Sequence, residues 1–82
     1  MESNLKDKVN YFLNNFNAVE INEYFCNGSF VDDCIKYYDN NSPASIIDYL
    51  NDTFLYIDMD YRETDKFSDM VKGTLETALK MF

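Results

Sequence analysis

Paired carboxylates are the side chains of this chain best suited to chemistry. They occur as Asp32 with Asp33, Asp48 with Asp52, and Asp58 with Asp60. Two carboxyl groups are sufficient for general acid–base catalysis such as glycoside hydrolysis. A chain of 82 residues, however, leaves little room for the cleft that a sugar substrate needs. We therefore interpret these pairs as solvated faces of amphipathic helices, and we expect no enzymatic activity.

Nucleophilic chemistry is restricted by the absence of histidine. The chain contains no His, so neither of its two cysteines, Cys26 and Cys34, has an imidazole to activate it. The two residues also lack the Cys-x-x-Cys spacing of redox motifs. We expect both to be buried thiols that pack as small apolar residues, with a Cys26–Cys34 disulfide in an oxidising compartment as the alternative.

One segment superficially resembles the calcium-binding loop of an EF-hand. Its positions 1, 3, 5, 6 and 12 are Asp58, Asp60, Arg62, Glu63 and Asp69. The resemblance fails where the motif is most demanding, because position 5 is the cation Arg62 and position 6 is Glu63 instead of the glycine that turns the loop. The aspartate at position 12 is also too short to bind calcium easily through both oxygens. We expect no metal site and no cofactor.

Negative charge is concentrated in the 22 residues from 48 to 69. This segment holds seven acidic residues against Arg62 and Lys66, a net charge of −5. On a helix Asp48 and Asp52 lie one turn, about 5.4 Å, apart, which is comparable to the spacing of successive phosphates along a DNA strand. The carboxylates predicted to bind a partner are Asp48, Asp52, Asp58, Asp60, Glu63, Asp65 and Asp69.

Tyrosines lie among these carboxylates. Tyr49 and Tyr56 fall beside the apolar stripe of the helix expected here, on the faces that carry the aspartates. Tyrosine gives a large contact area for two rotatable angles, and an arginine of a partner can pair with a carboxylate while stacking on a ring. We add Tyr49 and Tyr56 to the predicted binding surface. The alternative is that they form the rim of the core.

The overall composition excludes several classes of partner. Seven Lys and Arg residues against 15 Asp and Glu give a net charge of −8, whereas affinity for nucleic acid and for anionic membranes is carried by basic residues. The longest apolar run, residues 54–57, is far too short to span a bilayer. The first residues show no signal-peptide pattern. We expect a cytoplasmic protein whose partner is a basic protein surface, without direct binding to nucleic acid or membrane.

Apolar residues recur at steps of three and four in three segments, which is typical of amphipathic helices. The stripes are Leu5, Val9, Phe12, Phe16 and Val19; Ile47, Leu50, Phe54, Ile57 and Tyr61; and Phe67, Val71, Leu75, Ala78 and Phe82. A short helix is expected at 20–26. Another should follow, with Val31, Cys34 or Ile35, and Tyr38 on its buried face.

Capping and turn residues predict where these helices begin and end. We expect caps at Ser3 or Asn4, at Ser29 with Asp32, at Ser42 before Pro43, and at Thr64, and turns at Asn27-Gly28 and 39–41. Asp65 should lie in the first turn of the last helix. Gly73 lies inside that helix, where it indicates a close helix crossing.

The fold class that follows is all-α, with residues 1–82 forming a single acidic domain of four to five short helices. One stretch leaves an alternative open. Residues 53–61 also alternate between apolar and polar, with Leu55, Ile57, Met59 and Tyr61 on one side. This pattern suits a strand, and Val19 with Ile21 could supply a second one. The alternative is therefore an α+β fold with a small hairpin involving residues 53–61.

Three functions are compatible with such a domain. The leading hypothesis is a non-catalytic inhibitor that occupies the basic, nucleic-acid-binding surface of a target protein by mimicking DNA. In size, charge and helix content the chain is similar to anti-CRISPR and antirestriction proteins of phages and mobile elements. The second is an immunity protein or antitoxin that neutralises a basic toxin. The third is a homo-oligomeric helical scaffold, in which the apolar stripes associate between chains as a homodimer.

Overall fold

Five helices make up the described part of the chain. The computed structural model describes residues 5–34 and 44–82. The helices are α1 (Leu5–Asn15), α2 (Ala18–Cys26), α3 (Ser29–Asp33), α4 (Ala44–Asp60) and α5 (Phe67–Met81). No strand occurs in these two ranges, which confirms the all-α prediction. The alternative hairpin is wrong, because residues 53–60 continue the α4 helix without a break.

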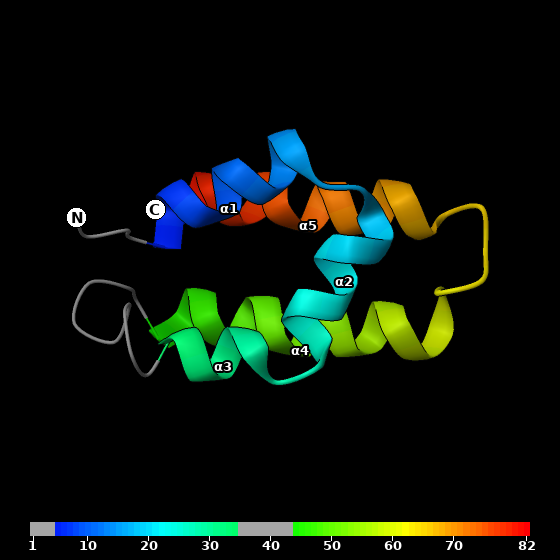
Figure 1. The fold of residues 1–82 in the computed structure, drawn as a ribbon, viewed down its shortest axis with the longest axis horizontal. Helices are drawn as coiled ribbons and strands as arrows, with labels where there is room; N and C mark the ends of the chain where they lie inside the picture. The colour runs from blue at the N-terminus through cyan, green and yellow to red at the C-terminus, as the bar shows by residue number, and fades with distance from the viewer. Residues whose placement is uncertain (1–4, 35–43) are drawn as a thin grey trace.

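The helices form two layers joined by α2 (Figure 1). Helices α1 and α5 lie in one layer, and α3 and α4 lie in the other. Helix α2 runs from the first layer to the second, where it contacts α3 and α4. Helices α4 and α5 run antiparallel and pack against each other along their length. Each long helix therefore has one face toward the core and one face outward.

A single hydrophobic core receives side chains from every helix. Phe25 of α2 lies at its centre, since its ring stacks on Phe54 of α4 with centroids 4.5 Å apart and planes 7° apart. Phe12 and Phe30 pack against the same ring at 5.8 and 4.7 Å. Offset and tilted ring pairs of this kind add to the stability gained from apolar burial. The aromatic cluster therefore ties α1, α2, α3 and α4 together.

The first break in the chain comes earlier than the apolar stripe suggested. Asn17 caps α2: its side-chain oxygen accepts from the Glu20 amide at 2.9 Å, and the Glu20 carboxylate accepts from the Asn17 amide at 3.1 Å. This reciprocal capping box satisfies two amides that would otherwise lack partners. Val19 consequently belongs to α2 and is exposed, contrary to the predicted stripe.

The turn at Asn27-Gly28 is confirmed, but the cap that follows it is not. Gly28 itself occupies the position before α3, with φ of +94°, a conformation that favours glycine. Ser29 is already the first helical residue, and no side-chain cap is formed. This register buries Phe30 and leaves Val31 exposed, so the predicted buried face was wrong at Val31, whereas Cys34 is buried as predicted.

Three details of the last two helices also differ from the prediction. Ile46, and not Ile47, is the fully buried residue at the start of α4. The Thr64 hydroxyl donates to the Tyr61 carbonyl at 2.9 Å, and α5 begins only at Phe67, so Asp65 precedes the helix. A Cβ atom at Gly73 would meet no atom within 4 Å, so no close crossing occurs there.

The remaining predicted features lie outside the described residues. They are the cap at Ser3 or Asn4, the contributions of Ile35 and Tyr38, the polar turn at 39–41, and the Ser42-Pro43 boundary. Helix α4 begins at Ala44, directly after that boundary.

Candidate protein-interaction surface

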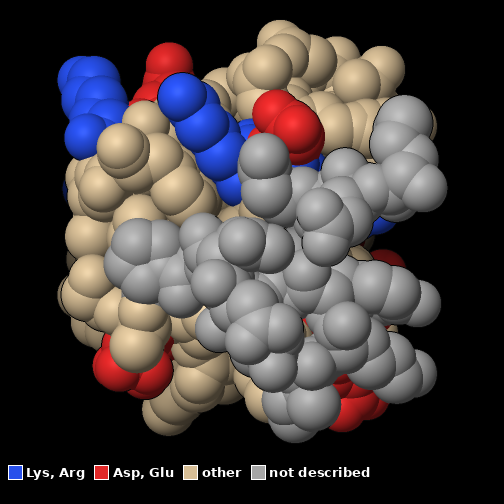
Figure 2. Space-filling model, turned by 90° about the vertical axis from the view of Figure 1, so that its left-hand side faces the viewer, with Lys and Arg blue, Asp and Glu red and all other residues tan. Residues whose placement is uncertain are grey.

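Charge is distributed unevenly among the helices. Helices α2, α3 and α4 together carry eight carboxylates and no Lys or Arg. Helices α1 and α5 carry four lysines against three acids. Figure 2 shows this division at one end of the molecule, where the described basic side chains lie over the upper half and the lower half shows only acidic ones. The net negative charge of the described helices is thus carried by α2, α3 and α4.

The outward face of α4 carries three of these carboxylates and one tyrosine in a single row. Asp48, Asp52, Tyr56 and Asp60 follow one another at steps of four residues, and all four are exposed. Residues four apart form one ridge on a helix, about 6 Å from one to the next. The sequence prediction for Asp48, Asp52 and Tyr56 therefore falls on one continuous surface, which we call the α4 ridge.

Apolar side chains lie beside the α4 ridge. Leu55 is 43% exposed. Met59, one helical turn after Leu55 on the same outward face, is 81% exposed. The sequence interpretation missed them because it grouped them with Ile57 on one side of a strand. The helical pattern of Leu50, Phe54 and Ile57 was the signal, since it places residues 55 and 59 opposite the core.

Tyr56 forms an exposed aromatic pair at the end of the ridge. Its ring meets Tyr61 edge-on at 5.4 Å, and the two hydroxyls lie 3.3 Å apart. This hydrogen bond is the main cause that raises the pKa of Tyr56, and the charge of Asp60 is a smaller one, so the Tyr56 hydroxyl stays protonated. Tyr49 differs, because it is half-buried and packs against the core. Tyr49 thus lies at the core rim, with only part of its ring accessible.

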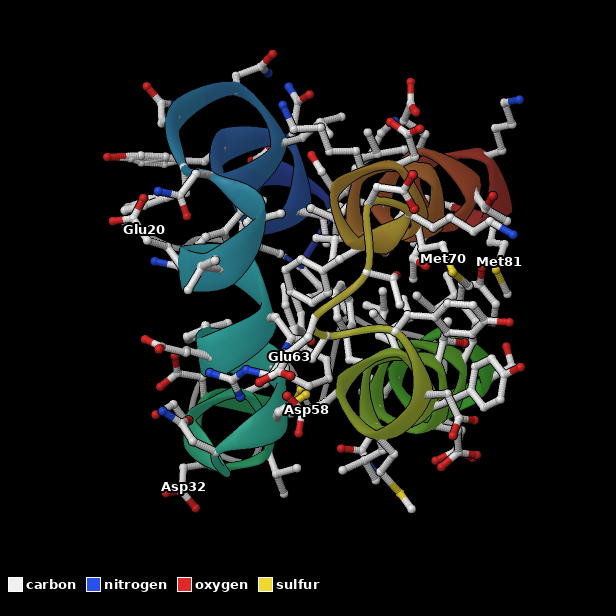
Figure 3. The ribbon with its side chains drawn as sticks, turned by 90° about the vertical axis from the view of Figure 1, so that its right-hand side faces the viewer. Glu20, Asp32, Asp58, Glu63, Met70 and Met81 are labelled. Atoms are coloured by element: carbon white, nitrogen blue, oxygen red, sulfur yellow. The ribbon has the colours of Figure 1, made fainter. Side chains whose placement is uncertain are left out.

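Asp58 points away from the ridge and toward α2 (Figure 3). Its Oδ1 accepts from the Asn22 amide at 2.8 Å and from the Arg62 guanidinium at 2.8 Å. Arg62 also lies 3.8 Å from Glu23. Asn22 is fully buried, so this contact satisfies a polar group that burial would otherwise destabilise. Asp58 therefore joins α4 to α2 and offers less of its charge to a partner than the ridge does.

Of the other three predicted acids, only Glu63 lies near the ridge. Glu63 and Asp65 are exposed in the turn between α4 and α5. Asp69 lies in the first turn of α5, where Lys66 and Lys72 are three residues away on either side. A shallow depression of about 390 Å³ lies at the end of α4. It is lined by Asp58, Met59, Asp60, Arg62, Glu63 and Thr64. It brings Glu63 close to Asp60, while Asp65 and Asp69 do not join it.

The cysteines have little capacity for chemistry. Both are free thiols. Burial, and then the nearby charge of Asp58, raises the pKa of Cys26 to about 11, and burial with Asp33 does the same for Cys34. Both are therefore protonated at neutral pH, and a protonated thiol is a weak nucleophile. The Cys26 thiol donates to the Phe54 carbonyl at 3.2 Å, which is a packing role.

Residues 5–34 and 44–82 contain no group of three or more Cys, Asp or Glu side chains placed to hold a metal ion. None of the described helices is long and apolar enough to cross a membrane. Comparison of the chain with protein-family models, with curated proteins and with solved structures finds no match. Any function must therefore be argued from the surface itself.

Proposed function

We propose that this protein is a small non-catalytic binding module that places its acidic side against a basic surface of another protein. The observation that supports this is the division of charge: eight carboxylates on α2, α3 and α4, with no cation on those helices. A surface of one sign attracts a partner of the other over several ångströms and accelerates association. A partner that supplies Lys and Arg also relieves the repulsion between neighbouring carboxylates such as Asp48 and Asp52.

The partner surface that fits best is one that normally binds nucleic acid. On the α4 ridge Asp48 and Asp52 lie about 6 Å apart along the axis, and Asp60 lies about 12 Å further on, so that the ridge offers cations a line of negative charges, as a phosphate backbone does. Inhibition would follow from competition, because the module and the nucleic acid cannot occupy the same cations together. Inhibitors of defence nucleases made by phages and mobile elements share this size, charge and helix content, which is an analogy at the level of physical type.

Affinity capture from a cell lysate tests the proposal. The immobilised protein should retain a basic, nucleic-acid-binding protein at about 0.1 M salt and release it at about 1 M, because the Debye length falls from about 10 Å to about 3 Å. Excess double-stranded DNA should release the same protein. Asp48→Asn with Asp52→Asn should weaken capture, whereas Glu76→Gln on α5 should not. Retention that is indifferent to salt and to DNA would contradict the proposal.

A further inference from the structure

The outward face of α4 is more than a row of charges, because three large apolar side chains are exposed together near its C-terminal end. Leu55, Tyr56 and Met59 are 43%, 50% and 81% exposed and lie within one turn of the helix. Elsewhere on α1, α2 and α3 the exposed large apolar residues are single ones, such as Val19 and Val31. Single exposed residues need no explanation, whereas a cluster on one helix face marks an interaction site.

Carboxylates stand at both ends of this apolar cluster. Asp48 and Asp52 precede it on the α4 ridge, and Asp60 follows it. Asp60 lies eight positions after Asp52, a distance of about 12 Å along the helix axis. At the second end, Met59 and Asp60 also line the depression that includes Glu63. The surface is therefore acidic, then apolar, then acidic along one helix.

This order of charges selects the occupant. A second copy of the chain, packed antiparallel on the same face, would bring the aspartates of one α4 against those of the other, since α4 has no cation. An anionic membrane would meet the same repulsion. A partner with basic residues at both ends and apolar residues between them complements every part of the face. A helix has the right shape, because its side chains fit the grooves between the ridges of another helix.

We propose that the outward face of α4 docks an amphipathic helix of the partner, with apolar residues at its centre and Lys or Arg at both ends. Leu55, Tyr56 and Met59 contact the apolar centre, and methionine adapts readily to the shape of what covers it. Asp48 and Asp52 pair with one basic end, and Asp60 with the other. This inference rests on the proposed function, since it names the element of the basic partner that the module holds.

Three synthetic helical peptides, each about as long as α4, test the inference. The first has basic ends and a Leu-rich centre, the second has Gln in place of the Leu residues, and the third has Glu in place of the basic residues. We expect the first peptide to bind at least about tenfold more tightly than the second in calorimetry, a difference of about 1.4 kcal/mol. The third should not bind. The methyl NMR signals of Leu55 and Met59 should shift with the first peptide.

Two variants connect binding to this face. Leu55→Ser with Met59→Ser should reduce the affinity for the first peptide to that for the second. Val19→Ser removes an equally exposed apolar residue from α2 and should leave both affinities unchanged. Circular dichroism of each variant establishes that the helices are retained.

The remaining outcomes separate this inference from the proposed function. Equal binding of the first two peptides would overturn helix docking and leave the electrostatic module standing. Failure of both basic peptides to bind would contradict both proposals. Light scattering that shows a dimer of the unmodified protein, lost in Leu55→Ser with Met59→Ser, would make a second copy the occupant and overturn the inference. An effect of Val19→Ser as large as that of the α4 variant would overturn it as well.

Discussion

Helices α4 and α5 are neighbours of similar length whose outward faces differ in their charged and apolar residues. On α5 the exposed charges alternate in sign, as Asp69, Lys72, Glu76 and Lys80 at steps of three and four. On α4 the exposed charges are aspartates alone, and they lie beside exposed Leu55 and Met59. Opposite charges at these steps stabilise an isolated helix, and like charges destabilise it by similar amounts.

The difference separates the work of folding from that of recognition. The inward faces of both helices are buried and largely apolar, as Phe54 of α4 and Leu75 of α5 illustrate. The outward face of α5 neutralises itself and needs nothing further from its surroundings. The outward face of α4 leaves both its charge and its apolar area without compensation within the helix. A partner supplies that compensation in our proposal, so the contrast between the two faces can be tested.

The inward face of α4 should carry the largest effect. Phe54→Ala removes the ring that stacks on Phe25 and leaves a cavity at the centre of the core. We expect the free energy of unfolding to fall by about 3–5 kcal/mol, measured by chemical denaturation followed by circular dichroism. Leu55→Ala, one residue away on the outward face, is the control and should cost well under 1 kcal/mol. Similar losses in both variants would show that the two faces of α4 contribute equally to stability, contrary to the comparison.

Most of the fold could be predicted from the sequence because its information is local. Steps of three and four identified the apolar faces of α1, α4 and α5, and Asn27-Gly28 identified the turn after α2. The errors arose where side-chain contacts that the apolar spacing does not reveal determined the structure. The first stripe ran through Asn17 because Phe16 and Val19 continue its spacing, while the capping box with Glu20 ends α1 there. Once that break is known, Ala18, Ile21 and Phe25 form the stripe of α2.

The candidate site was less predictable, because proximity in sequence is a poor guide to proximity on a surface. In the sequence, the seven acids between residues 48 and 69 form one cluster. The turn after Asp60 separates them, since Asp69 lies on α5 among lysines and Asp58 turns inward to Asn22. Conversely, Leu55 and Met59 are recognised as exposed neighbours only when the helical pattern of the core residues of α4 is used to fix the direction of the core. Helix direction, and not composition, defined the α4 ridge.

Asp58 offers a way to sharpen the contrast within α4 itself. Asp58→Ala should leave the buried amide of Asn22 without its acceptor and release Arg62 from α4. We expect a loss of about 1–3 kcal/mol in the free energy of unfolding. Asp48→Ala is the matched control on the outward face, and its stability should change by no more than about 0.5 kcal/mol. A loss at Asp48 equal to that at Asp58 would contradict the assignment of these two carboxylates to different roles.

Gly73 makes α5 less stable than its charge pattern alone implies. Because a Cβ atom there would meet nothing within 4 Å, Gly73→Ala should raise the free energy of unfolding by about 0.5–1 kcal/mol. The same substitution at Gly28 provides the control. Gly28 has φ of +94°, so Gly28→Ala should destabilise the protein. If Gly73→Ala lowered the stability instead, the outward face of α5 would make a contact near Gly73 in addition to its alternating charges.

The smallest effects test the comparison most directly, through their sign. Glu76→Gln removes a charge placed four residues from both Lys72 and Lys80, so it should lower the free energy of unfolding by about 0.2–0.5 kcal/mol. Asp52→Asn removes one of two like charges four residues apart on α4, so it should raise that free energy by a similar amount. Thermal unfolding at low salt measures both, and about 1 M salt should abolish both by screening. If Asp52→Asn instead lowered stability at low salt, the aspartates of α4 would already be compensated within the protein. A basic partner would then relieve no repulsion, and the argument for the α4 ridge as a binding surface would lose its physical basis.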